Sequence, residues 1–185
     1  KVDKNLAEKS QIDIPVTVKN TGFVAGKDVV ELYYTAPYIE KQIEKSSIVL
    51  GDFIKTDVLQ PGESKTYTLS IKARDMASYD YNDANHNDFK GYELDSGTYT
   101  IGICHNAHTP EKTIDCTLTN PIQYTSNSLG NEVTNLFDDV SSHVSEYLSR
   151  ANKFANSSCL VGSSEESYRT VDDEFISSLT YTLND

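Results

Sequence analysis

The stretch Ile12-Asp13-Ile14-Pro15-Val16-Thr17-Val18-Lys19 indicates the fold class most clearly. Its apolar and polar residues alternate, as in a β-strand that buries one face. Outward from it, apolar or β-branched runs separated by turn residues predict further strands at residues 29–35, 48–54, 67–71, 98–104 and 113–119. The strand at residues 48–54 is expected to be irregular at Gly51. Residues 1–119 are therefore predicted to form an all-β, two-sheet antiparallel sandwich of about seven strands.

Residues 120–185 follow a different pattern. Apolar residues recur there at spacings of three and four, which predicts an amphipathic helix. These residues are Val133, Phe137, Val140, Val144, Tyr147, Leu148, Ala151 and Phe154. A second, shorter helix is expected at residues 171–183. We therefore expect a sandwich domain over residues 1–119 and a partly helical extension, a linker toward a following domain, over residues 120–185.

Composition excludes some kinds of partner. The 185 residues contain 28 acidic and 16 basic side chains, for a net charge of −12. A role based on nucleic acid is not expected, because binding to phosphates uses clustered Lys and Arg. No apolar run approaches the ~18 residues of a membrane span, so no membrane partner is expected. The chain begins at Lys1 without an initiator Met, which suggests a fragment of a longer protein.

Four motifs, in order along the chain, resemble the fibronectin type III-like domain of family 3 glycoside hydrolases. They are Val18-Lys19-Asn20-Thr21-Gly22 with Val29-Val30-Glu31-Leu32-Tyr33, Leu59-Gln60-Pro61-Gly62-Glu63, Asp75-Met76-Ala77-Ser78-Tyr79-Asp80, and Gly91-Tyr92-Glu93-Leu94-Asp95-Ser96-Gly97. Two tail motifs resemble a segment of β-glucosidases of permuted domain order. They are Gly130-Asn131-Glu132-Val133-Thr134-Asn135-Leu136-Phe137-Asp138-Asp139 and Tyr147-Leu148-Ser149-Arg150. The resemblance implies an immunoglobulin- or fibronectin type III-like sandwich within a longer β-glucosidase.

The same resemblance implies that the catalytic residues lie in another domain of the parent protein. Enzymes of the family cleave β-glucosides with two carboxylates, and their nucleophile is the Asp of a Ser-Asp-Trp motif on a separate barrel. This chain contains no Trp. We therefore expect no catalytic residue, no cofactor and no metal in the chain, which would brace the other domains of its parent. Tyr147, Leu148 and Arg150 are expected to mark the junction, and self-association of the isolated chain is plausible.

Two other functions remain open. The chain could be an autonomous carbohydrate-binding module, with Tyr33, Tyr34, Tyr38, Tyr79 or Tyr81 stacking on sugar rings. Most of these tyrosines are nevertheless expected in the core or at an interface, with the hydroxyl reaching a polar partner. The third possibility is a protein-interaction sandwich, because the fold itself hosts many functions.

Residues 80–88 are rich in Asp and Asn, whose oxygens could bind Ca²⁺. Counted from Asp83, however, the sixth position is Asp88 rather than Gly, and the twelfth is Leu94 rather than Glu. We therefore expect a loop whose side chains bond the local backbone. Cys104, His105 and His108 could supply metal ligands, but their spacing matches no closed tetrahedral set.

Cys104 and Cys116 flank the predicted hairpin. If they faced each other, Ile101 and Ile103 would lie on the opposite side of the sheet from Ile114 and Leu118. A shift of the pairing by one residue gathers the apolar side chains and separates the cysteines. The sequence therefore predicts no disulfide between Cys104 and Cys116. This prediction and the odd number of cysteines slightly favour the cytoplasm.

Overall fold

The computed structural model describes residues 4–127, 129–133 and 149–152. The chain separates into two compact units, Lys1–Glu146 and Tyr147–Asp185. In the second unit, the described residues form one short 3₁₀-helix, η2 (Arg150–Asn152). The expected amphipathic helices fall almost entirely outside the described residues. Among the residues that are described, no helix is long and apolar enough to cross a membrane.

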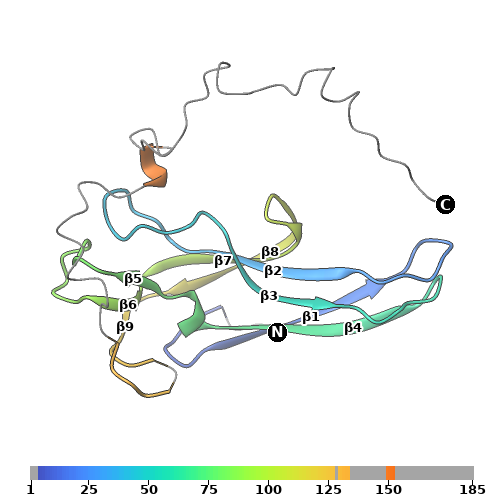
Figure 1. Ribbon diagram of the computed structural model, residues 1–185, viewed down its shortest axis with the longest axis horizontal. Helices are drawn as coiled ribbons and strands as arrows, with labels where there is room; N and C mark the ends of the chain where they lie inside the picture. Colours follow the sequence, from blue (N-terminus) through green and yellow to red (C-terminus); the bar gives the residue numbers. More distant parts are fainter. Residues whose placement is uncertain (1–3, 128, 134–148, 153–185) are drawn as a thin grey trace, which may run out of the picture. The chain divides into compact units, whose positions relative to one another are not determined.

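The first unit consists of antiparallel β-sheets (Figure 1). Its elements are β1 (Gln11–Lys19), β2 (Val29–Thr35), β3 (Val49–Lys55), β4 (Ser64–Lys72), the 3₁₀-helix η1 (Ala73–Met76), β5 (Ser78–Asp80), β6 (Gly91–Leu94), β7 (Gly97–Asn106), β8 (Thr109–Leu118) and β9 (Ile122–Tyr124). β1 pairs with β4, a second sheet has the order β3-β2-β7-β8, and a third has the order β5-β6-β9. This all-β arrangement agrees with the expected sandwich.

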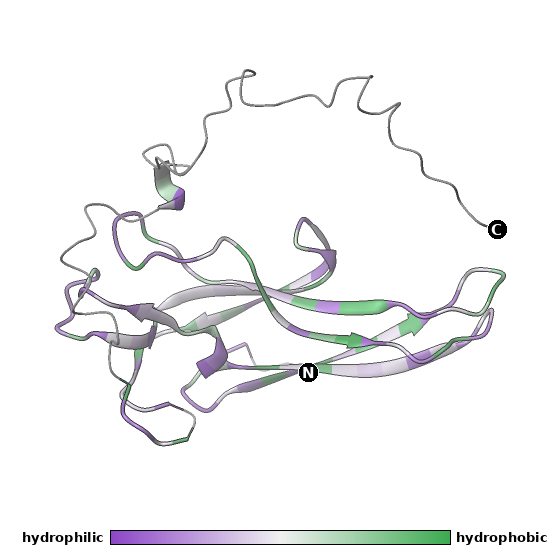
Figure 2. Cartoon of the chain, viewed as in Figure 1, coloured by the Kyte–Doolittle hydropathy of each residue, from purple (hydrophilic) through white to green (hydrophobic). Residues whose placement is uncertain are grey.

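Buried and outward-facing residues alternate along the strands, and the buried ones form the hydrophobic core. In β2 the residues Val30, Leu32 and Tyr34 are buried, whereas their neighbours in sequence lie on the outer face. Leu69 and Ile71 of β4 and Ile101 of β7 join them in one hydrophobic cluster. Successive side chains of a strand point to opposite faces, so each strand contributes one apolar row to the space between the sheets. The hydropathy colouring in Figure 2 shows apolar segments along β1 and β2.

The expected irregularity at Gly51 is confirmed. Leu32 pairs with Asp52 and Tyr33 pairs with Leu50, so Gly51 is the extra residue of a β-bulge. A Cβ atom at Gly51 would lie 2.5 Å from Ile71 Cδ1 and 3.1 Å from Leu32 Cδ2. The bulge turns Asp52 toward β4, where its Oδ2 accepts a hydrogen bond of 2.8 Å from the Ser70 amide. Gly51 thus permits the close approach of β3 to β4.

The β7–β8 hairpin confirms the predicted separation of the cysteines. Tyr99 is paired with Cys116 and Ile101 with Ile114, whereas Cys104 is paired with Pro110. The apolar side chains therefore share one face of the sheet. Cys104 and Cys116 are both buried, and neither is part of a disulfide. Burial raises the pKa of the Cys104 thiol.

Three short strands lie outside the ranges expected from the sequence. β5 and β6 flank residues 80–88, the segment that was expected to form a loop, and β9 follows the expected boundary at residue 119. β9 pairs with β6 through Tyr92 and Tyr124, Glu93 and Gln123, and Leu94 and Ile122. Tyr124 is buried in the hydrophobic cluster. Residues 122–124 therefore complete a sheet of the first unit.

Candidate functional site

Residues 80–88 connect β5 to β6 through bonds from side chains to the local backbone, as predicted. The Asp80 carboxylate accepts hydrogen bonds from the amides of Asn82 and Ala84. Asp83 Oδ1 accepts bonds from the amides of Asn87 at 2.8 Å and Asp88 at 3.1 Å. Asp and Asn side chains form such turns readily because their oxygens reach amides only two to five residues ahead.

A buried carboxylate, Glu93 of β6, lies beneath this loop. Its Oε1 accepts a bond of 2.6 Å from Asn85 Nδ2, and its Oε2 accepts one of 2.7 Å from Asn87 Nδ2. Burial raises the pKa of Glu93, and the nearby charges of Asp95 and Asp80 raise it further. The two amide hydrogen bonds oppose this effect, because they stabilise the charged form.

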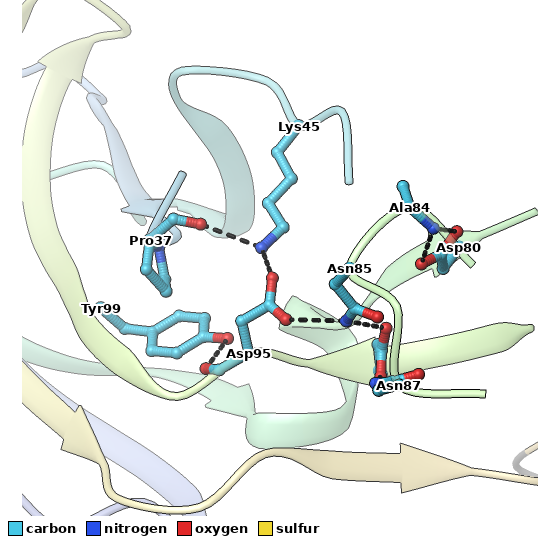
Figure 3. Close-up of polar contacts among 9 residues, drawn as sticks. Pro37, Lys45, Asp80, Ala84, Asn85, Asn87, Asp95 and Tyr99 are labelled. Carbon is cyan, nitrogen blue, oxygen red and sulfur yellow. Dashed lines mark hydrogen bonds and ion pairs between the residues drawn. The ribbon is translucent and has the colours of Figure 1, made fainter. Parts of the chain in front are cut away.

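Lys45 connects a third segment of the chain to β6 and the loop of residues 80–88 (Figure 3). It comes from the loop between β2 and β3, and its Nζ donates to Pro37 O at 2.9 Å and forms an ion pair with Asp95. The Lys45 side chain is only 4% exposed and the Asp95 side chain 17%. The Tyr99 hydroxyl donates to Asp95 O at 3.0 Å. We refer to Lys45, Asp80, Asn85, Asn87, Glu93 and Asp95 as the polar cluster.

The polar cluster fixes three loops at one end of the sandwich. It joins the β2–β3, β5–β6 and β6–β7 connections, which are distant in sequence. Its carboxylates are engaged by amides and by Lys45, so the geometry supports a structural role better than a catalytic one. Among the described residues, the buried Asn85 Oδ1 has no hydrogen-bond partner. In the same part of the chain, no group of three or more His, Cys, Asp or Glu side chains could hold a metal ion.

The other end of β2 carries an exposed apolar loop, residues 20–28. Phe23 is 98% exposed and Val24 78%. The loop is nevertheless fixed, because Asn20 Nδ2 donates to Val24 O at 2.9 Å and to Leu59 O at 2.8 Å. Gly26 and Leu59 also exchange two backbone hydrogen bonds, of 3.1 and 2.8 Å. We call this surface, formed by Phe23 and Val24, the apolar end.

The outer face of the β3-β2-β7-β8 sheet carries a second apolar group. Glu31 of β2 pairs with Phe53 of β3, and Tyr33 pairs with Leu50. Phe53 and Leu50 are both exposed, whereas Tyr33 is half-buried. The pKa of Tyr33 is raised, mainly by burial and then by a hydrogen bond with Glu31. This face offers aromatic surface beside a carboxylate.

The other tyrosines considered for sugar binding occupy different parts of the unit. Tyr34 is buried in the core, and its hydroxyl donates to Asp75 O at 3.3 Å. The Tyr38 hydroxyl donates to Glu44 Oε2 at 3.1 Å. Tyr79 packs edge-on against Tyr92, with ring centroids 5.0 Å apart. These four tyrosines, Tyr33, Tyr34, Tyr38 and Tyr79, therefore do not form one platform.

Residues predicted for other roles are also dispersed or undescribed. His105 approaches Glu111 at 3.6 Å on the surface, whereas the neighbouring Cys104 is buried on β7. Of the expected junction residues, Tyr147 and Leu148 lie outside the described residues. Arg150 begins η2 in the second unit.

The sequence analysis did not single out Lys45 and Glu93 of the polar cluster or Phe23 of the apolar end. Lys45 stands in the polar stretch 40–47, where nothing in the pattern indicates burial. Glu93 alternates with apolar neighbours in Gly91-Tyr92-Glu93-Leu94, but it points inward. Phe23 was detectable, because a large apolar residue between Gly22 and Gly26 sits in a turn rather than in a strand.

Comparison with known proteins shows which family and which enzymes the first unit resembles. Residues 28–107 match the family described as fibronectin type III-like domain. β-Glucosidase A of Butyrivibrio fibrisolvens is 48% identical over 80 residues, 43% of this chain and 9% of that protein. A β-glucosidase of Ruminococcus albus is 42% identical over 88 residues, 48% of this chain and 9% of that protein. The chain thus matches about a tenth of the length of these relatives.

Solved structures show the same relationship. A β-glucosidase of Paenibacillus barengoltzii superposes with a TM-score of 0.57 and 26% identity, over 69% of this chain and 16% of that one. β-Glucosidase 3B of Thermotoga neapolitana, solved with glucose, gives a TM-score of 0.53 and 25% identity, over 67% of this chain and 16% of that one. In both cases the likeness covers a limited part of a much longer chain.

Proposed function

We propose that this chain, whose residues 28–107 form a fibronectin type III-like domain related to regions of family 3 β-glucosidases, is a non-catalytic module that braces neighbouring domains. The longer protein would be a β-glucosidase-like glycoside hydrolase. The observation that carries this proposal is the apolar end, where a Phe side chain is presented to solvent on a loop held by hydrogen bonds.

The energetics of the apolar end favour a contact surface. Burying a side chain such as Phe gains about 1.5–3 kcal/mol relative to leaving it exposed. Docking onto a rigid loop costs less conformational entropy than docking onto a mobile one. Asn20 and the Gly26–Leu59 pair supply that rigidity. A neighbouring domain that covers Phe23 and Val24 would therefore gain most of the burial energy.

The polar cluster supports the same role at the other end. Its buried hydrogen bonds and ion pair hold three loops in one arrangement, which a brace between domains requires. Tyr147, Leu148 and Arg150 remain our proposed junction with a following domain. At that junction, Leu148→Asp should loosen the domains of the longer enzyme.

A domain exchange tests the proposal. Residues 4–133 would replace the matching domain of the Butyrivibrio fibrisolvens enzyme, and Phe23→Asp would be compared with Thr21→Asp in the exchanged protein. Thr21 is exposed on the same loop, so its variant controls for the added charge. We expect faster limited proteolysis between domains for Phe23→Asp alone. Equal proteolysis of the two variants would argue against docking through this end.

The aromatic outer face favours autonomous carbohydrate binding as a second candidate function. Phe53 is exposed, and Tyr33 and Glu31 lie near it on the same face. Titration of the full chain with cello-oligosaccharides separates the two functions, because a brace requires no saturable binding. Saturable binding that Phe53→Ala abolishes would support the second function and count against the first.

A further inference from the structure

The two larger sheets of the first unit end in strands that pair on one side. Among the described strands, β1 and β4 pair with each other, and β3 and β8 are the outer strands of the sheet β3-β2-β7-β8. The free side of such a strand presents amides and carbonyls, which are a template for a strand of another molecule. How each edge is closed therefore decides whether the module can pair with a second copy.

Proline and a short paired segment block the edges of β1 and β8. The Ala73 amide donates to Ser10 O, and because bonded and non-bonded pairs alternate, Pro15 turns its backbone to the free side of β1. Pro15 has no amide to offer there. On β8, Thr117 is already paired with Asn5. The edges of β3 and β4, which lie beside each other, remain to be closed (Figure 1).

Two backbone amides point into the space between β3 and β4. The Thr56 amide donates to Asp28 O, so the alternation along β3 turns the Phe53 amide away from β2. The bonded pair at the start of β1 likewise places the Ser70 amide on the side of β4 that faces away from β1. Among the described strands, neither amide therefore has a partner in its own sheet.

The Asp52 carboxylate binds both of these amides. Its Oδ1 accepts a hydrogen bond of 2.8 Å from the Phe53 amide, and its Oδ2 accepts one of 2.8 Å from the Ser70 amide. Asp52 pairs with the buried Leu32, so its half-buried side chain lies on the inner face of β3. A charged side chain that points inward on an edge strand opposes pairing with a further strand.

We propose that Asp52 keeps β3 from pairing with β3 of a second copy of this chain. An exposed apolar edge strand is prone to such pairing, and Leu50 and Phe53 are exposed on β3. Without the carboxylate, two copies of β3 would pair antiparallel about a two-fold axis, each satisfying free amides of the other. With it, the module meets its neighbours through side chains and not through an added strand. The inference goes beyond the bracing role and does not depend on it.

Hydrogen exchange of single amides in the full chain tests the closure of the edge. We expect Asp52→Ala to speed the exchange of the Phe53 and Ser70 amides at least about tenfold each. Asp13→Ala is the matched control, because Asp13 Oδ1 accepts a bond of 2.6 Å from the Ser70 hydroxyl and leaves the Ser70 amide bound to Asp52. Unchanged exchange of both amides in Asp52→Ala would overturn the proposal.

Sedimentation velocity over a range of concentrations tests the pairing with a second copy. Asp52→Ala should associate at least about tenfold more tightly than the wild-type chain, whereas Asp13→Ala should match the wild type. Adding Phe53→Pro to Asp52→Ala removes the freed amide and should restore the wild-type behaviour. Adding Phe53→Ala instead removes the same ring but keeps the amide, so association should remain stronger. Equal association of Asp52→Ala and Asp13→Ala, or no difference between the two double variants, would overturn the proposal.

Asp52→Asn covers the case in which Asp52→Ala does not fold, because it keeps the size of the side chain. The nitrogen of the new side-chain amide cannot accept a hydrogen bond, so one of the two backbone amides loses its partner. That backbone amide should exchange at least about tenfold faster than in the wild-type chain. Full protection of both amides in this variant would contradict the proposed role of Asp52.

Discussion

Gly51 shows how one residue determines the fit of two sheets. Its missing side chain leaves room for Ile71 and Leu32, and the bulge brings Asp52 to the Ser70 amide. We expect Gly51→Ala to lower the free energy of unfolding by about 1–3 kcal/mol, because the added methyl group overpacks the core. Gly26→Ala is the control, since a Cβ there meets no atom within 4 Å. Urea denaturation of both variants measures the difference, and equal effects would contradict this account.

Lys45 should contribute far more to stability than an ordinary surface lysine. Lys45→Ala would leave Asp95 in a largely buried site without its cation, at an expected cost of about 3 kcal/mol. Lys65→Ala removes the ion pair between Lys65 and Asp57, whose side chains are 51% and 65% exposed, and should change the stability far less, because water screens an exposed pair. Denaturation with guanidinium compares the two variants. A cost for Lys45→Ala as small as that for Lys65→Ala would contradict the role of the polar cluster.

Glu93 should make stability depend on pH. Its pKa is raised in the folded protein above the ordinary value of 4.5, so the folded state binds this proton more tightly than the unfolded state does. That contribution is present below the ordinary pKa and is lost as pH rises through the raised pKa. The wild-type protein should therefore lose stability relative to Glu93→Gln as the pH rises from 4.5 through the raised pKa. A constant or growing advantage of the wild type over this range would be inconsistent with the raised pKa.

At the scale of elements, removal of β9 tests where the first unit ends. A chain that stops after Thr119 loses Tyr124, which is buried in the core, and also loses the pairing of β9 with β6. We expect this truncation to cost at least about 3 kcal/mol, as for removal of a large buried side chain. A chain that stops after Val133 keeps β9 and is the control. Thermal unfolding followed by circular dichroism compares them, and equal midpoints would show that β9 is dispensable.

The longer strands could be predicted from the sequence because the alternation extends over enough residues. Tyr67, Leu69 and Ile71 reveal β4, and Tyr99, Ile101 and Ile103 reveal β7. The same alternation predicted that Cys104 and Cys116 are not opposed. β5, β6 and β9 have only three or four residues each, too few to display a period. Their pairing is decided by tertiary contacts, which local pattern does not contain.

The candidate sites were harder to predict than the strands. Asx turns in residues 80–88 follow from side-chain chemistry within a few residues, so the sequence was sufficient there. The polar cluster joins Lys45 to Asp95 across fifty residues, and only the fold brings them together. The apolar end is visible as Phe23 in a turn, but its rigidity depends on Asn20 reaching Leu59.

At the scale of the whole molecule, the two ends of the sandwich differ in the side chains that they carry. The polar cluster fixes loops from within, whereas the apolar end presents Phe23 and Val24 to solvent. The relatives carry the matching region within chains roughly ten times as long as the match. We therefore propose that this module acts through contact with a neighbouring domain and contributes no catalytic group.

The most direct test is the half-life of activity at elevated temperature for the domain-exchanged β-glucosidase. Loss of about 1.5–3 kcal/mol of apolar burial at the contact should shorten the half-life of the Phe23→Asp form roughly tenfold or more. Thr21→Asp should leave it unchanged, and the isolated module should melt at the same temperature with either substitution. Equal half-lives for the two exchanged enzymes would contradict the claim that this end braces a neighbouring domain.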